Sequence, residues 1–280
     1  MNTATQSQDH RGNALPAAPR VICGIDASRA DETAVRAACD LAGTRGHIAL
    51  VCVTSAMGVG ATAQATIAPA RATEALERAM KQARDAGVRS SAHLIRGRQA
   101  SEALLRAASD GDVLVVGTHG HSRAGGIALG AVATNALHRA SVPVLVARTA
   151  QSPMEGALLF ASDGSQGSDA ACTLLCRVAA RHKPPITLFH VEGGSVDESA
   201  RHALARQAVE LAEATGVDPT VVAGRGDPAD SIVEAATAGA FSLIVVGSHG
   251  RTGLRALGSV SERVAHRAPC SVLVARPPAS

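Results

Sequence analysis

The chain has almost no aromatic residues: none of its 280 positions is Trp or Tyr, and the three Phe residues bring aromatics to only 1%. Proteins that bind single-stranded nucleic acid stack the bases on aromatic side chains, so this scarcity argues against that class. The net charge of +3 includes no dense basic stripe, so we expect no nucleic acid as a partner. The core must be packed from aliphatic side chains.

Long apolar runs are also missing. No stretch approaches the roughly 18 consecutive apolar residues of a membrane-spanning helix, and residues 1–18 are polar, without the apolar segment of a secretion signal. The six cysteines lie mostly inside apolar runs, and no second His or Cys pair completes a metal site with Cys172 and Cys176. We therefore expect a disordered tail over residues 1–18, no membrane partner, reduced cysteines and a cytoplasmic location.

What the chain does contain is an internal repeat. Four segments recur in the same order: RVICGIDAS (20–28) as ALLFASDGS (157–165), HIALVCV (47–53) as PITLFHV (185–191), DVLVVGTHG (112–120) as SLIVVGSHG (242–250), and VPVLVAR (142–148) as CSVLVAR (270–276). Such self-similarity indicates a duplicated unit. It predicts a first domain over residues 19–149 and a second over 156–277, joined by a polar linker; these are called the first and second halves below.

Within each half, short β-branched apolar runs alternate with longer segments rich in Ala, Leu, Arg and Glu. Residues 29–43, 69–87 and 196–216 have helical spacing, and each segment ends on a glycine. Alternating strands and helices with continuously apolar strands are typical of a parallel sheet that is covered on both faces. We expect an α/β, Rossmann-like fold with five strands and four helices in each half.

Two kinds of residue stand where predicted strands end. Asp26 and Asp163 follow the first strand of each half, and Gly-x-x-Gly turns begin at Gly117 and Gly247 after the fourth. In open parallel sheets ligands bind beyond the carboxyl ends of the strands, where glycines allow close approach and free N–H groups hold anions. A carboxylate there accepts from a ribose hydroxyl or holds Mg²⁺. In the plainer alternatives each Asp caps the next helix and the glycines only form tight turns.

Three features occur together: the Asp after strand one, the spacing Gly-x2-Gly-x9-Gly-[Ser/Thr] after strand four, and the Val-rich fifth strand. In this combination the chain resembles the tandem form of the universal stress protein family over residues 19–276. This resemblance implies two open five-stranded parallel sheets in the order 3-2-1-4-5. It also implies ATP at the strand ends in one branch of the family. Fifth strands pair across a two-fold axis in the family, which here would join the halves as an intramolecular pseudo-dimer; a further homodimer stays open.

The resemblance implies that the same set of residues in each half lines an adenosine pocket and a phosphate loop, with Mg²⁺ as an accompanying ion. The first site would consist of Asp26, Val53, Gly117, His119, Gly120, Gly130 and Val132. The second would consist of Asp163, Val191, Gly247, His249, Gly250, Gly258, Ser259 and Val260.

Each half departs from the family pattern differently. The first has Ala131 at the hydroxyl position, and the loss of one hydrogen bond to phosphate costs about 1–2 kcal/mol. The second keeps Ser259 but has seven residues, not nine, between Gly250 and Gly258. We expect this shorter loop to shift the start of the next helix. The sites should then be unequal, with the first the better one and fewer than two nucleotides bound per chain.

The sequence lacks the usual groups of an efficient catalyst. It has no Walker A motif, no nucleophile with a His/Asp relay and no pair of carboxylates placed for acid–base work. We therefore expect an adenine-nucleotide-binding protein of stress response or signalling, which hydrolyses ATP slowly at most. The alternative is an interaction module of the same family with degenerate pockets and no nucleotide.

Overall fold

The computed structural model describes residues 19–28, 30–54, 67–96, 99–109, 111–118, 129–149, 151–192, 198–248 and 257–277. The expected tail over residues 1–18 lies outside these ranges. The first half contains β1 (Arg20–Ile25), α1 (Asp31–Ala42), β2 (His47–Thr54), α2 (Pro69–Asp85), β3 (Arg89–Arg96), α3 (Ala100–Ala108), β4 (Val113–Gly117), α4 (Ala131–Arg139) and β5 (Val144–Ala147). The second half contains β6 (Leu158–Ala161), α5 (Gln166–Ala179), β7 (Ile186–Glu192), α6 (Glu198–Thr215), β8 (Thr220–Arg225), α7 (Pro228–Ala238), β9 (Leu243–Gly247), α8 (Ser259–Arg267) and β10 (Ser271–Ala275).

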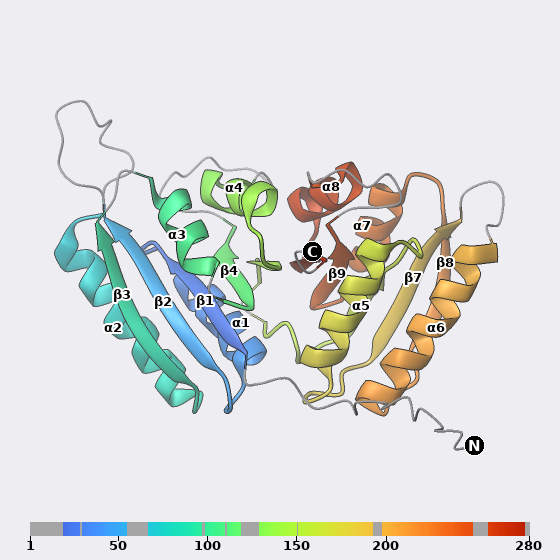
Figure 1. The fold of residues 1–280 in the computed structure, drawn as a ribbon, viewed down its shortest axis with the longest axis horizontal. Coiled ribbons are helices and arrows are strands. Elements are labelled where there is room, and N and C mark those ends of the chain that lie inside the picture. The colour runs from blue at the N-terminus through green and yellow to red at the C-terminus, as the bar shows by residue number, and fades with distance from the viewer. Residues whose placement is uncertain are drawn as a thin grey trace, which may run out of the picture.

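The strands form one sheet with ten members, in the order β3-β2-β1-β4-β5-β10-β9-β6-β7-β8 (Figure 1). Pairing within each half is parallel, and the order 3-2-1-4-5 predicted for each half is confirmed. At the centre β5 and β10 pair antiparallel, with Leu145 opposite Leu273. This is the fifth-strand contact that the family resemblance implied, and it makes the two predicted sheets continuous.

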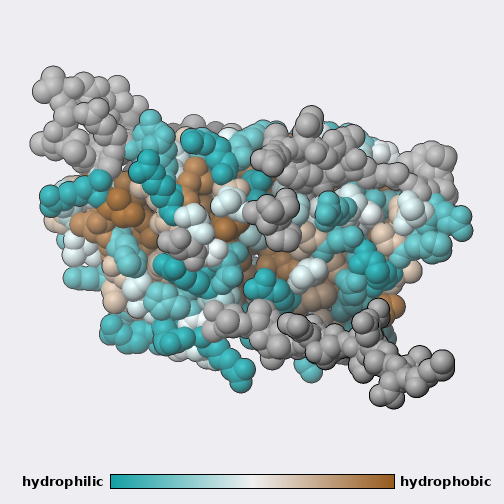
Figure 2. All heavy atoms as spheres, viewed as in Figure 1, coloured by the Kyte–Doolittle hydropathy of each residue, from teal (hydrophilic) through white to brown (hydrophobic). Residues whose placement is uncertain are grey.

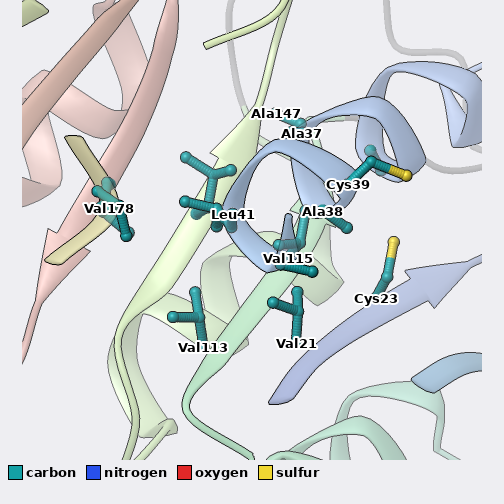
Figure 3. Close-up of a cluster of buried hydrophobic side chains, with 14 of the residues drawn as sticks. Val21, Cys23, Ala37, Ala38, Cys39, Leu41, Val113, Val115, Ala147 and Val178 are labelled. Carbon is teal, nitrogen blue, oxygen red and sulfur yellow. The ribbon is translucent and has the colours of Figure 1, made fainter. Parts of the chain in front are cut away.

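Helices cover both faces of the sheet, which explains why the central strands are apolar throughout. One buried cluster lies on the side of α1, α2, α5 and α6, and a second lies on the side of α3, α4, α7 and α8. Both clusters contain residues of both halves. Figure 3 shows part of the first cluster, where Val178 of α5 belongs to the same core as Leu41 of α1. The halves therefore share a core.

The ends of the fifth strands bind the opposite half reciprocally. A guanidinium N–H of Arg148, after β5, donates to the carbonyl of Ala265 at 2.7 Å, and Arg276, after β10, donates to the carbonyl of Leu137. These carbonyls lie in the last turns of α8 and α4, where a cation also interacts favourably with the helix dipole. The two arginines thus tie each fifth strand to the last helix of the opposite half.

The outer strands β3 and β8 differ from the central ones. They carry three of the exposed large apolar side chains, Leu94, Val221 and Val222, which are 40%, 58% and 39% exposed. Figure 2 shows a mostly hydrophilic face with a hydrophobic area over the region that β2, β3 and α3 occupy in Figure 1. Within the described ranges no helix has the length and apolar character needed to cross a membrane.

Candidate nucleotide site at the strand ends

The carboxylates that follow β1 and β6 hold tight turns. Asp26 Oδ1 accepts from the N–H of Ser28 at 2.9 Å, and Asp163 Oδ1 accepts from the N–H of Ser165 at 3.0 Å. These are Asx turns, two residues long. The N-caps of α1 and α5 are Ala30 and Ser165, so the alternative in which the aspartates cap the helices is wrong.

The long loops after β4 and β9 close in the same way. The N–H of Gly130 donates to Thr118 O and that of Gly258 donates to Ser248 O, both at 2.7 Å. Each glycine is an extended N-cap, and the helix begins at the next residue. The expectation that the shorter second loop shifts the start of its helix is therefore wrong, because the missing residues fall between two fixed ends.

Some of the predicted phosphate-loop residues fall between those ends. His119, Gly120, His249 and Gly250 lie outside the described residues. The described part of each loop still presents the first turn of a helix whose N-cap has no side-chain hydrogen bond. Unpaired N–H groups at a helix start are a favourable place for an anion.

The remaining second-half residues come together around a cavity of about 230 Å³. It lies at the carboxyl ends of β6, β7 and β9, beside the starts of α7 and α8. Its lining contains all six described residues of the predicted second site, namely Asp163, Val191, Gly247, Gly258, Ser259 and Val260.

The cavity also has walls that the sequence reasoning missed. They include Ser162, Ser168, Phe189, His190, Ile232 and Ser261. Ser162 and His190 each directly precede a predicted site residue, and Ser261 is two residues after Ser259, so proximity in sequence could have suggested them. Ile232 lies in a helix that carried no motif, and only the fold brings it here.

Two glycine and serine contacts shape one side of the cavity. A Cβ on Gly247 would lie 2.5 Å from the carbonyl carbon of Gly167, so glycine is required for α5 to pack this closely on β9. The hydroxyl of Ser261 donates to the carbonyl of Gly247 at 2.6 Å and ties α8 to the same strand end. The cavity is therefore bounded by close, specific backbone packing.

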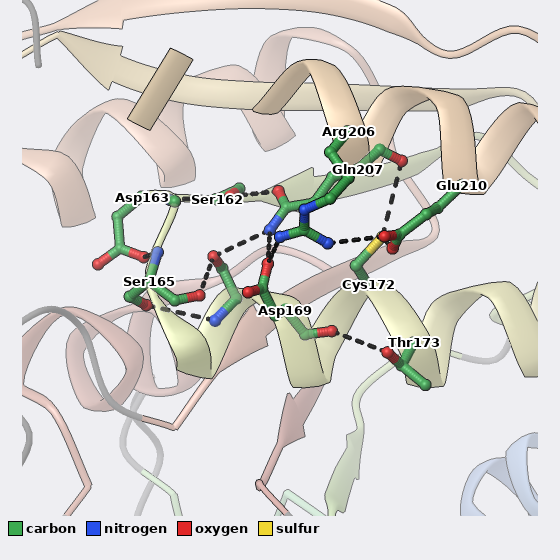
Figure 4. A network of polar contacts seen from close by, with 11 residues as sticks. Ser162, Asp163, Ser165, Asp169, Cys172, Thr173, Arg206, Gln207 and Glu210 are labelled. Carbon is green, nitrogen blue, oxygen red and sulfur yellow. Dashed lines mark hydrogen bonds and ion pairs between the residues drawn. The ribbon is translucent and has the colours of Figure 1, made fainter. Parts of the chain in front are cut away.

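A buried hydrogen-bond network supports the cavity from the side of α6 (Figure 4). The fully buried side chain of Gln207 accepts from Ser162 Oγ at 2.7 Å and donates to Ser168 Oγ at 3.2 Å and to Asp169 Oδ1 at 2.7 Å. Because both serines line the cavity, Gln207 fixes two of its wall residues from behind. A satisfied buried network of this kind rigidifies its surroundings.

The first half brings its predicted residues to the same edge but with different chemistry. Asp26 and Val53 follow the paired residues Ile25 and Cys52, and Gly117 ends β4 on the other side of β1. Gly130 and Val132 stand at the start of α4. Aligning the paired segments shows which side chains differ. Ala131 and Ala133 correspond to Ser259 and Ser261 of the second half, and Asp31 corresponds to Ser168.

Asp31 makes this region of the first half more acidic. Its Oδ1 accepts from the N–H of Asp26 at 3.0 Å, and its Oδ2 is buried without a hydrogen-bond partner in the described part of the chain. Burial raises the pKa of Asp31 to about 7 from an ordinary 3.8, and the negative charge of Asp26 adds to the effect. Two neighbouring carboxyl groups disfavour a polyanion in the first half. At the corresponding positions the second half has one carboxyl group, that of Asp163, together with Ser168.

Comparison with known proteins agrees with the geometry. The sequence profile described as the universal stress protein family matches residues 18–148 and again 155–276. The chain belongs to the universal stress protein family. A universal stress protein from Mycolicibacterium smegmatis is 32% identical over 201 residues, which is 65% of this chain and 68% of that protein. In the curated relatives matched next, the alignment spans 64% of their length.

Solved structures of universal stress proteins have the same architecture. One from Archaeoglobus fulgidus superposes with a TM-score of 0.72 at 21% identity, over 92% of this chain and 96% of that one, which shows the shared fold. Another universal stress protein, solved in complex with cAMP, matches 42% of this chain and 95% of its own at 26% identity, with a TM-score of 0.34.

A divalent cation would depend on the nucleotide in this universal stress protein. Among the described residues no group of three or more His, Cys, Asp or Glu side chains is placed to hold a metal. Mg²⁺ is commonly bound by one or two carboxylates together with substrate phosphates. Asp163 is the carboxylate of the cavity, so the residues would fit Mg²⁺ only together with bound phosphate and as the alternative to a ribose hydroxyl on Asp163.

Proposed function

We propose that this universal stress protein binds one adenine nucleotide, ATP, in its second half, and that occupancy of this site serves stress response or signalling. The observation that carries the proposal is the 230 Å³ cavity lined by the six described residues of the predicted second site. Pockets for drug-sized ligands span about 300–1,000 Å³. The cavity therefore suits the nucleoside, and the phosphates would extend past Gly258 and Ser259 toward the start of α8.

Each part of the site has a role in this proposal. Asp163 Oδ1 is held by Ser165, and Oδ2 takes no hydrogen bond from the described residues, so it is available to accept from a ribose hydroxyl. The apolar side chains of Phe189, Val191 and Ile232 offer a surface for the base. The N–H groups of the first turn of α8 and the hydroxyl of Ser259 would meet phosphate oxygens.

The preference for the second half reverses the ranking that the sequence favoured. That ranking depended on a displacement of the helix after the shorter second loop. In the structure α8 begins directly after Gly258, as α4 begins directly after Gly130, so there is no such displacement. The first half in turn lacks the hydroxyls of Ser259 and Ser261 and carries the additional carboxyl group of Asp31. These differences support one nucleotide per chain.

We further propose a binding function with slow hydrolysis at most, in the cytoplasm. All six cysteines are unpaired, which fits a reducing compartment. The cavity lining offers a single carboxylate, Asp163, and His190 is already hydrogen-bonded through Nδ1 to the carbonyl of Ser162 at 2.8 Å. Among the described residues, neither side chain is hydrogen-bonded to a hydroxyl or thiol that could act as a nucleophile.

Isothermal titration calorimetry with MgATP tests the proposal in the full chain. We expect a stoichiometry near one and a Kd that rises about 10- to 100-fold in Asp163→Asn, since a hydrogen bond to a charged group contributes about 1.5–3 kcal/mol. Asparagine keeps the acceptor for Ser165, so the turn survives. The matched control Asp26→Asn should leave the Kd unchanged.

Two results would contradict the proposal. Equal losses in Asp163→Asn and Asp26→Asn, with a stoichiometry of two, would mean that both halves bind. Absence of any heat with ATP, together with no nucleotide released on denaturing the purified protein, would favour the alternative of an interaction module without nucleotide.

A further inference from the structure

Two cysteines of the second half lie one helical turn apart, and neither lines the nucleotide cavity. Cys172 and Cys176 stand on the side of α5 that packs against α6. All six cysteines of the chain are free and lie within the described ranges, and Cys176 is the one that is not buried. Residues four apart on a helix are neighbours on its surface. These thiols therefore form a pair with one accessible member.

The two sulfurs meet the same turn of α6. Cys172 Sγ lies 3.6 Å from Glu210 Oε2 and 3.7 Å from the carbonyl oxygen of Gln207 (Figure 4). Cys176 Sγ lies 3.5 Å from the carbonyl oxygen of Glu210. The thiols also hydrogen-bond to each other, with Cys172 as the donor, which lowers the pKa of Cys176 and raises the pKa of Cys172. Cys176 is therefore the more reactive thiol, and a second sulfur is in direct contact with it.

The first half shows that the fold does not require this pair. In the alignment of the two halves used above, Val35 corresponds to Cys172 and Cys39 to Cys176. The buried positions of α1 and α5 coincide in this alignment, and Val35 is fully buried. Burial raises the pKa of Cys39 to about 11. A valine thus fills in one half the core position that a second thiol fills in the other.

The surroundings decide which thiophilic ligand fits the pair. Within the described residues no third His, Cys, Asp or Glu completes a metal site with these thiols, so a tetrahedral zinc ion lacks ligands here. Glu210 and Asp169 already share the single guanidinium of Arg206, at 2.6 Å and 2.5 Å. A Cu(I) ion held by two thiolates has a net negative charge, which is unfavourable beside these carboxylates. The pair therefore favours a ligand that forms a neutral adduct.

Trivalent arsenic forms such an adduct. One molecule of arsenous acid, As(OH)3, condenses with two thiols to give (RS)2AsOH and two molecules of water. Two As–S bonds form, two As–O bonds break, each departing hydroxide takes a thiol proton, and no atom changes its oxidation state. The remaining hydroxyl is the third ligand, so the chain supplies only two. Arsenic is pyramidal and holds its sulfurs side by side, as these thiols already lie, whereas Cu(I) and Hg(II) hold two sulfurs on opposite sides.

We propose that Cys172 and Cys176 form a two-thiol binding site for trivalent arsenic, as arsenous acid or its monosubstituted organic forms. The accessible sulfur of Cys176 forms the first As–S bond, and the adjacent sulfur of Cys172 forms the second. Because the second bond closes within one helical turn, it is an intramolecular step, and the pair holds arsenic more tightly than a single thiol does. The site is separate from the nucleotide cavity and does not depend on it.

Phenylarsine oxide is the probe, added in equimolar amount to the reduced full chain and followed by native mass spectrometry. We expect one phenylarsenic group per chain, which survives glutathione and is removed by the dithiol dimercaptopropanol. Cys176→Ser and Cys172→Val each leave a single thiol of the pair, so the affinity should fall at least about tenfold and glutathione should remove the group. Valine is the residue that the first half has at this core position, so Cys172→Val keeps the helix packing.

Cys39→Ser is the matched control, because it removes the counterpart of Cys176 in the first half and leaves the pair intact. It should bind the probe as the unchanged chain does. Three results would overturn the proposal: no glutathione-resistant group on the unchanged chain, its retention in Cys172→Val or Cys176→Ser, or its loss in Cys39→Ser. Capture of Cu(I) from a chromogenic chelator without capture of the arsenical would overturn the choice of ligand. Affinity for ATP should be the same in all three variants, since none of these residues lines the cavity.

Discussion

The carboxyl group of Asp31 makes the stability of the protein fall as the pH rises through neutrality. Burial raises its pKa in the folded chain to about 7 from 3.8. Between these values the unfolded chain releases the proton and the folded chain keeps it, so the unfolded state binds fewer protons and the free energy of unfolding decreases with increasing pH. The stabilisation is complete below the lower pKa and is lost above the upper one.

The size of the effect follows from the shift. One pKa unit corresponds to 1.36 kcal/mol, so a shift of roughly three units gives an upper limit of about 4 kcal/mol. Asn at position 31 has the shape of the protonated acid, and its carbonyl oxygen can still accept from the N–H of Asp26. We therefore expect Asp31→Asn to approach the stability of the unchanged chain only as the pH falls to about 4, and to become progressively more stable than it up to pH 8, by up to that amount.

Urea unfolding of both proteins at several values between about pH 4 and pH 8 measures this difference. Other groups titrate in the same range, and comparing the two proteins removes their shared contribution. Asp85→Asn is the matched control, because this exposed carboxylate pairs with Lys81 and exposed pairs contribute about 0–1 kcal/mol. If Asp31→Asn showed the same pH dependence as the unchanged chain, the buried carboxyl group would not be its cause.

Three further predictions concern the seam and the second half. Val144→Asp places a charge opposite Val274 in the fully buried β5–β10 pair; we expect a loss of at least about 3 kcal/mol and an increased radius of gyration in small-angle scattering, and unchanged values would count against a seam that joins the halves. Gln207→Ala removes the acceptor of the buried Ser162 hydroxyl and leaves a cavity, so it should lower the free energy of unfolding by about 2–4 kcal/mol, whereas a loss under 0.5 kcal/mol in urea unfolding would show that the network stabilises little. Ser261→Ala removes the bond to the carbonyl of Gly247 and should raise the Kd for ATP several-fold with little change in melting temperature; an unchanged Kd would mean that this bond does not shape the site.

Local sequence patterns were sufficient for the repeat, the elements and their order. Continuously apolar strands and helices that end on glycine are signals within one segment, and the described residues contain five strands and four helices in each half, as predicted. The predicted helices over 29–43, 69–87 and 196–216 correspond to α1, α2 and α6 with ends that differ by at most two residues. The strand-end residues Asp163 and Gly247 were also found in this way, since strand ends in a parallel sheet meet at one edge, whereas Val191 came from the family resemblance.

Contacts between segments distant in sequence were decided only by the tertiary structure. Loop length alone suggested that α8 would shift, but the hydrogen bond from Gly258 to Ser248 fixes its start regardless of the residues between. Nothing near Gln207 in sequence marks it as the support of a cavity wall, because its partners Ser162 and Ser168 lie about 40 positions earlier. The sequence by itself therefore determined which residues reach the sheet edge in each half. The packing of helices against that edge decided that Ser168 and Ile232 join the predicted residues of the second half around one cavity, because these side chains meet only in the folded chain.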